Sequence, residues 1–144
     1  MMTKDMSKNY HVQEKLKTDL KAVNPFLDRI SQDVFALINS KDEAFKIKLA
    51  LEEAVVNSMR HGNHLDPDRS VAVHIEADKK EIVMDVHDEG KGFDFRVLPD
   101  PTRGEKAHLP SGRGVYLMRK LMDKVEFYDG GAGVRMTKSF RVRP

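Results

Sequence analysis

The spacing of the apolar residues differs between the first and second halves of this chain, and the difference limits the folds open to it. Before residue 60 they recur every three or four residues, as in amphipathic helices, and after residue 70 they mostly alternate with polar residues, as in strands. This order predicts an α/β (α+β) two-layer sandwich, in which helices cover one face of a mixed, mainly antiparallel sheet. The predicted elements are a possible edge strand over 11–19, helices over 20–38 and 42–61, strands over 71–77 and 82–86, a helix over 115–122, and strands over 125–127 and 134–142.

Local signals refine the boundaries of these elements. Ser40 followed by Glu43 forms a capping box, which predicts a helix start, and Gly62 is placed as the C-terminal cap of the same helix. The first residues, 1–9, are polar and are expected to be a flexible N-terminus. A chain of 144 residues suits one compact domain, which we expect over 10–144.

The composition excludes several classes of function. With 25 Lys and Arg against 23 Asp and Glu, the net charge of +2 gives no reason to expect nucleic acid or a membrane surface as partner. The absence of cysteine excludes disulfides and thiolate chemistry. No set of His, Asp and Glu has the sequence spacing of a zinc site, and His74 and His87 are expected to face solvent. No apolar run approaches the roughly 20 residues of a membrane span, so we expect a soluble cytoplasmic protein.

The first group of candidate residues lies on the helix predicted over 42–61. Glu53 and Asn57 are four positions apart and therefore share a face, and His61 continues the row. The Asn oxygen is a suitable ligand for Mg²⁺, and the Glu could orient or deprotonate a hydroxyl group. A solvated pair on a helix surface is the competing interpretation.

The second group follows the strand predicted over 82–86. Because strand faces alternate, Asp88 continues the inward row of this strand, where a buried carboxylate needs a donor such as an adenine amino group. Gly90 and Gly92 permit close backbone approach to a ligand. A plain turn capped by Asp88 would give the same pattern.

The third group precedes the helix predicted after Gly114. Gly112, Arg113 and Gly114 would place free amides and a helix dipole next to a phosphate group, although a flexible loop end is also compatible. The stretch before it, 95–113, carries three prolines and is predicted to be a lid over a ligand.

Taken together, the three groups resemble the motifs of GHKL-type ATPases. Glu53-Ala-Val-Val-Asn57 is similar to their N box, Asp88-Glu-Gly90-Lys-Gly92 to their adenine box, and Gly112-Arg-Gly114 to their second glycine box. The longer stretches LEEAVVNSMRHGN and GRGVYLMRKLMDKVEF resemble the anti-sigma-factor serine/threonine-protein kinases in particular.

The resemblance implies a kinase that binds ATP with Mg²⁺ and phosphorylates a serine of an anti-anti-sigma (STAS-type) antagonist. It also implies that the protein sequesters a sigma factor and forms a homodimer, without direct contact to nucleic acid or membrane. By position, Glu53 would be the catalytic base, Asn57 would ligate Mg²⁺ and Asp88 would bind adenine. His61, Gly90, Gly92, Gly112, Arg113, Gly114 and Thr137 would complete the nucleotide site.

One departure from the family pattern concerns the last strand. The family's Gly-Thr pair is Gly133-Val134 here, and Thr137 could supply the missing hydroxyl only from a different register. Three other functions remain to be weighed: a nucleotide-gated binding module without phosphotransfer, the catalytic domain of a histidine kinase, and a non-enzymatic domain with accidental motifs.

Overall fold

The computed structural model describes residues 10–90 and 110–140, with side chains from residue 114 onward in the second range. Its element order confirms the predicted succession of a strand, two helices, two strands, a helix and two strands. The elements are β1 (Tyr10–Lys17), the 3₁₀ turn η1 (Leu20–Ala22), α2 (Val23–Ile38), α3 (Lys41–Asn57), the π-helical turn η2 (Ser58–Gly62), β2 (Ser70–Ala77), β3 (Glu81–His87), α4 (Pro110–Leu121), β4 (Lys124–Tyr128), the 3₁₀ turn η5 (Asp129–Gly131) and β5 (Gly133–Ser139).

The five strands form one sheet in the order β1-β2-β3-β5-β4, and every pairing is antiparallel. β1 is therefore an edge strand, as predicted. The sheet was expected to be mixed, but the described strands contain no parallel pair. Short turns join β2 to β3 and β4 to β5, and such turns can connect only antiparallel neighbours.

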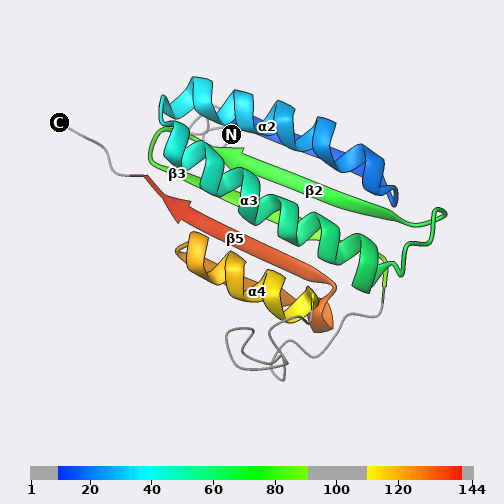
Figure 1. The fold of residues 1–144 in the computed structure, drawn as a ribbon. Helices are drawn as coiled ribbons and strands as arrows, with labels where there is room; N and C mark the ends of the chain where they lie inside the picture. Colours follow the sequence, from blue (N-terminus) through cyan, green and yellow to red (C-terminus); the bar gives the residue numbers. More distant parts are fainter. Residues whose placement is uncertain (1–9, 91–109, 141–144) are drawn as a thin grey trace, which may run out of the picture.

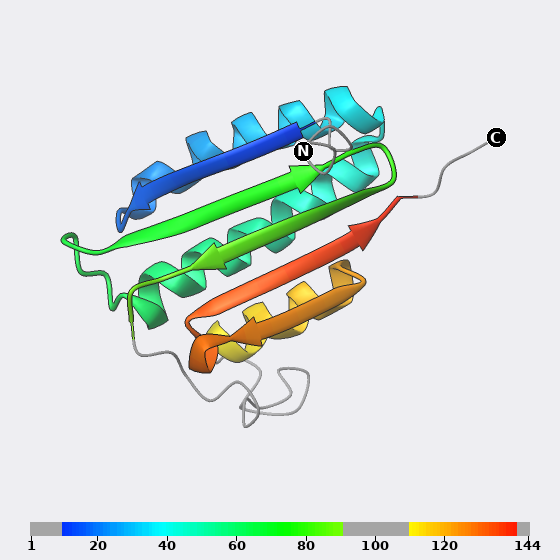
Figure 2. The same cartoon turned by 180° about the vertical axis from the view of Figure 1, so that it is seen from behind.

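All three long helices lie on one face of the sheet, with α3 between α2 and α4 (Figure 1). Seen from behind, the strands are not covered by any described helix (Figure 2). We call this uncovered side the outer face. The arrangement confirms the predicted two-layer sandwich.

The core lies between the helices and the inner face of the sheet. Alternate residues of β2 and β3 point into it, as their two-residue period predicted, and the facing stripe of each helix closes it. None of the helices in the described ranges has the length and apolar character needed to cross a bilayer. The largest fully buried side chains include Leu27, Ile30, Ile47, Leu51, Met59, Ile75, Ile82, Met84, Met118 and Met136.

The N-terminal cap of α3 is present where the capping box placed it. The Glu43 N–H donates to Ser40 Oγ over 3.2 Å. The Glu43 carboxylate does not complete the box but lies 3.5 Å from the Lys138 ammonium on β5. The cap therefore starts the helix while its third residue also ties the helix to the sheet.

The beginning of α4 differs from the prediction. The helix starts at Pro110, not after Gly114, so the last four residues of the stretch assigned to a lid are helical. The proline was interpreted as a loop residue, but it fits the first turn of a helix, where its missing N–H would have no partner anyway. The remainder of the predicted lid, 95–109, lies outside the described residues.

Candidate functional site

The candidate site lies where four elements meet at one end of the sheet. α3 ends there, β3 ends at His87, α4 begins and β5 begins. A small cavity between them is lined by Asn57 from α3, by Asp88 and by Gly133 at the start of β5. The three groups of residues singled out in the sequence each contribute to this one place.

Asp88 is the most deeply buried charged residue of the site. It continues the inward row of β3, as predicted, and is 4% exposed. Its backbone N–H donates to the Ala132 carbonyl over 3.0 Å, and its Oδ1 accepts from the Gly90 N–H over 2.8 Å. The Ser58 hydroxyl donates to the same carboxylate. The side chain is thus held in one orientation at the edge of the cavity.

The surroundings of Asp88 affect its ionisation. Burial raises the pKa of its carboxyl above the usual value, and the hydrogen bonds from Gly90 and Ser58 and the charge of His87 offset part of the rise. A carboxylate that has lost much of its hydration gains more from an additional donor than an exposed one does. Asp88 is therefore suited to accept a hydrogen bond from a ligand amino group.

Two glycines allow the turn after β3 to pack against the end of α3. A Cβ atom at Gly62 would overlap the carboxyl group of Asp88, and one at Gly90 would overlap the Gly62 carbonyl. Gly62 was predicted to be the C-terminal cap of the helix, and this is wrong, because the cap residue is Asn63. It ends the π-helical turn and the next residue, Asn63, has φ −86°, so the glycine is required by close approach.

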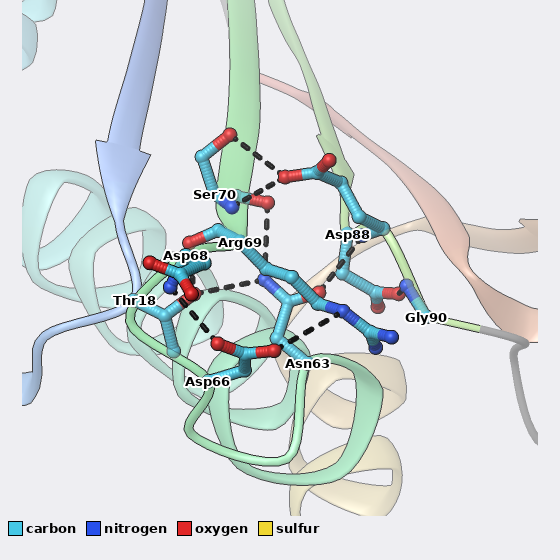
Figure 3. A network of polar contacts seen from close by, with 9 residues as sticks. Thr18, Asn63, Asp66, Asp68, Arg69, Ser70, Asp88 and Gly90 are labelled. Carbon is cyan, nitrogen blue, oxygen red and sulfur yellow. Dashed lines mark hydrogen bonds and ion pairs between the residues drawn. The ribbon is translucent and has the colours of Figure 1, made fainter.

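Asn63 joins the π-helical turn to the sheet. It is fully buried, and its Nδ2 donates to Thr18 Oγ1 over 2.9 Å and to the Ser70 carbonyl over 3.0 Å. Its Oδ1 accepts from the Glu89 N–H over 2.9 Å. Figure 3 shows Asn63 among these partners, beside Asp88 and Gly90. This single amide fixes the residue next to Asp88 and the start of β2.

Glu89 closes this network on its exposed side. Its carboxylate accepts from the Ser70 N–H over 2.5 Å and from the Ser70 hydroxyl over 3.1 Å. These bonds hold the pKa of Glu89 below its usual value. Glu89, which lies between Asp88 and Gly90, therefore anchors the turn.

Glu53 and Asn57 face the first turns of α4. A Cβ atom at Gly114 would lie 2.8 Å from Asn57 Nδ2 and 2.9 Å from Glu53 Oε2, so any other residue there would displace the ends of these two side chains. Asn57 Nδ2 is buried, and no described residue accepts a hydrogen bond from it. A buried amide without a partner costs free energy unless a ligand or water completes it.

His61 lies on the π-helical turn, past the end of the regular helix. Burial lowers the pKa of its imidazole, and the neighbouring Arg60 and His64 lower it further. Its Nε2 is buried, and no described residue bonds it. His61 is thus a neutral ring at neutral pH with one nitrogen open to a ligand.

The remaining predicted residues are not all brought to the cavity. Gly112 lies in the first turn of α4, and the Arg113 backbone follows it. Gly92 lies outside the described residues. Thr137 pairs with Val83 and Lys124 on the outer face, with Arg135 as its neighbour on that face, so the structure does not place it with Asp88.

The polar groups of the site fit a nucleotide with Mg²⁺. The Asn57 amide and His61 Nε2 are unpartnered polar groups, Asp88 is a buried acceptor, and the first turn of α4 has amides without intrahelical partners. The cavity itself measures about 10 Å³, room for about one water molecule. A purine is larger than this cavity, whose apolar lining includes Met118 and Phe127.

Sequence reasoning missed two contributors to this geometry, Ser58 and Asn63, and gave a third, Gly62, a different role. Ser58 and Asn63 stand inside the LEEAVVNSMRHGN stretch, but their bonds to Asp88 and to β2 depend on the π-helical turn. Gly62 was noticed for the wrong reason. The available sequence signal for Asn63 was its position, as a polar residue directly after the glycine that ends the helix.

Comparison with known proteins agrees with this geometry. An anti-sigma F factor of Oceanobacillus iheyensis is 35% identical over 102 residues, covering 67% of this chain and 70% of that protein. A serine-protein kinase RsbW of Halalkalibacterium halodurans is 30% identical over 139 residues, covering 89% of this chain and 85% of that protein.

The fold is also found among solved structures. The crystal structure of the RsbU and RsbW domains of Rv1364c from Mycobacterium tuberculosis matches with a TM-score of 0.57 and 18% identity, covering 94% of this chain and 34% of that one. The family model described as "Histidine kinase-like ATPase domain" matches residues 16–138. This chain therefore belongs to the histidine kinase-like ATPase domain family.

Proposed function

We propose that this protein is an ATP-dependent protein-serine kinase that also acts as an anti-sigma factor. The observation that carries the proposal is the convergence of Glu53 and Asn57 from α3 with Gly114 from α4, beside the cavity that Asn57 and Asp88 line. A Glu–Asn pair on a solvated helix surface, which was the competing interpretation, would not lie against a glycine of a facing helix. The names of the relatives support the same function.

Different residues of the site are expected to bind different parts of the nucleotide. Asp88 is expected to bind the adenine amino group, and Gly90 gives the turn the close packing that holds Asp88 in place. The amides of the first turn of α4, around Gly112 and Gly114, would bind the phosphates. Asn57 would ligate Mg²⁺, which neutralises phosphate charge when bound.

The proposed reaction is transfer of the γ-phosphoryl group to a serine. The serine hydroxyl oxygen forms a bond to the γ-phosphorus, the bond from that phosphorus to the β-bridging oxygen breaks, and ADP leaves. Glu53 accepts the hydroxyl proton. Its place beside Gly114, at the start of α4, puts the carboxylate near the expected phosphate position.

The proposed partners follow from the relatives' names. A sigma factor would be sequestered, and an anti-anti-sigma (STAS-type) antagonist would accept the phosphoryl group. We further propose that the chain acts as a homodimer in the cytoplasm, where a sigma factor works.

The test is incubation with labelled ATP, Mg²⁺ and candidate antagonist proteins. Wild type should transfer label to a serine of one antagonist, and Glu53→Ala should reduce transfer by about 10²–10⁴-fold while ATP still binds. Glu52→Ala removes the neighbouring carboxylate of the same helix and is the matched control, expected to transfer normally. ATP binding without transfer in wild type would instead identify a nucleotide-gated binding module.

A further inference from the structure

A cluster of metal-ligating side chains lies on the outer face of the sheet, on the side away from the helices that line the nucleotide site. His11 on β1 and His74 and Glu76 on β2 each present one ligand atom, and these atoms all lie within 4.8 Å of one another. The strands are adjacent and antiparallel, with His11 paired to Glu76 and Gln13 paired to His74. This register places the three side chains side by side.

The distances within the cluster suit tetrahedral coordination. His11 Nε2 and His74 Nε2 are 2.7 Å apart, and His74 Nε2 is 3.5 Å from Glu76 Oε1. Two ligand atoms on one tetrahedral zinc ion are about 3.3 Å apart, given metal–ligand bonds of about 2.0–2.1 Å. The second distance is close to this value. The first is a hydrogen bond between two exposed rings, and a bound ion would replace it by moving the two nitrogens apart.

The cluster is accessible from solvent. The side chains of His74 and Glu76 are 46% and 29% exposed, and His11 is exposed. A groove of about 200 Å³ runs along the same face beside His74, lined by Gln13, Lys15 and Asp85 among others. An ion bound by the three side chains would therefore keep a coordination position open to water.

We propose that His11, His74 and Glu76 form a binding site for a divalent transition-metal ion, of which Zn²⁺ is the representative. Two imidazoles and one carboxylate favour zinc, copper or nickel over Mg²⁺ and Ca²⁺, which prefer oxygen ligands. The ion would join the edge strand β1 to β2. The site is separate from the nucleotide site, since strand alternation places its three residues on the outer face of the sheet.

The sequence spacing gave no sign of this site. His11 and His74 are 63 residues apart, and only the pairing of β1 with β2 brings them together. The expectation drawn from the sequence concerned the spacing of His, Asp and Glu along the chain, and this cluster is formed across two strands instead. His74 was correctly expected to face solvent.

The test is calorimetric titration of the full chain with Zn²⁺ alone, in the absence of nucleotide. Wild type should bind one ion per chain, and His11→Gln and His74→Gln should each weaken binding by at least about tenfold, the scale on which even a supporting group matters. The matched control is His87→Gln, because His87 also faces outward but pairs with Asp129 over 2.9 Å. It should bind as wild type does, and so should His61→Gln, which alters the nucleotide site.

Two further measurements separate ligation from loss of folding. Circular dichroism should show that the four variants remain folded, since His11 and His74 are exposed. The melting temperature should rise with added Zn²⁺ in wild type and not in His11→Gln, because a ligand that binds only the folded chain stabilises it. Equal zinc affinity in wild type and the His11 and His74 variants, or loss of binding in His61→Gln, would overturn the proposal.

Discussion

The contact between Gly62 and Asp88 allows a sharp test of the site's architecture. In Gly62→Ala the new methyl group would overlap Cγ and both carboxylate oxygens of Asp88. Asp88 cannot move aside freely, because it is 4% exposed and bonded to Gly90 over 2.8 Å. Overpacking of this kind costs about 1–3 kcal/mol, and losing the Gly90 bond adds about 1 kcal/mol. We therefore expect the free energy of unfolding to fall by about 2–4 kcal/mol.

The collision can be isolated with a double-mutant cycle measured by urea unfolding. In an Asp88→Ala background the overlapping atoms are gone, and Gly62→Ala should be neutral or stabilising by about 0.4–1 kcal/mol, the usual effect of Gly→Ala in a compatible conformation. Asp88→Asn keeps a side chain of the same shape and is the matched control. The full destabilisation by Gly62→Ala should therefore persist in that background. A cost that is equal within about 0.5 kcal/mol in the Ala and Asn backgrounds would refute the reasoning.

Further predictions concern the same site. Asp88→Asn should weaken ATP binding about tenfold or more in a calorimetric titration, because a charge-assisted bond to adenine is lost; unchanged affinity would remove Asp88 from the adenine site. Asn57→Ala should abolish the Mg²⁺ dependence of ATP binding, and binding that still depends on Mg²⁺ would place the ligand elsewhere. Asn63→Ala should lower the free energy of unfolding by about 2–3 kcal/mol in urea, since three hydrogen bonds of a buried side chain are lost, and a loss below about 0.5 kcal/mol would contradict the anchoring role. Because the pKa of Asp88 is raised in the folded state, its protonation contributes to the free energy of unfolding. This contribution is fully present below the unfolded-state pKa near 3.8 and is lost as pH rises through the folded-state pKa. The free energies of unfolding of wild type and Asp88→Asn should be compared between about pH 3 and 7. The variant should gain stability relative to wild type as pH rises, and a constant difference would contradict the raised pKa of Asp88.

The fold could be predicted from the sequence wherever periodicity reports burial. The stripes of α2 and α3 and the alternation in β2 and β3 gave the right elements, because each of these has one face in the core. The start of α4 could not be found in this way, since Pro110 is compatible with a loop and with a first helical turn.

The motif residues of the candidate site could be predicted from the sequence, but the residues that hold them in place could not. Asp88 could be placed by strand alternation, and Glu53 and Asn57 by helical spacing. The bonds of Asn63 link segments far apart in the chain, and the π-helical turn shifts the spacing on which helical reasoning depends. Long-range contacts of this kind leave no local pattern.

The place of β1 at the sheet edge has a consequence for the order in which the molecule opens and closes. Among the described strands β1 pairs with β2 alone, and α2 and α3 stand between the two strands in the chain. Closing so long a loop is slow, so β1 should join the sheet after the β2–β3 hairpin has formed. In the native state its amides should exchange with solvent deuterium through local opening, before those of the inner strands β2 and β3. β1 is thus expected to detach from the sheet before these two strands and to return after them.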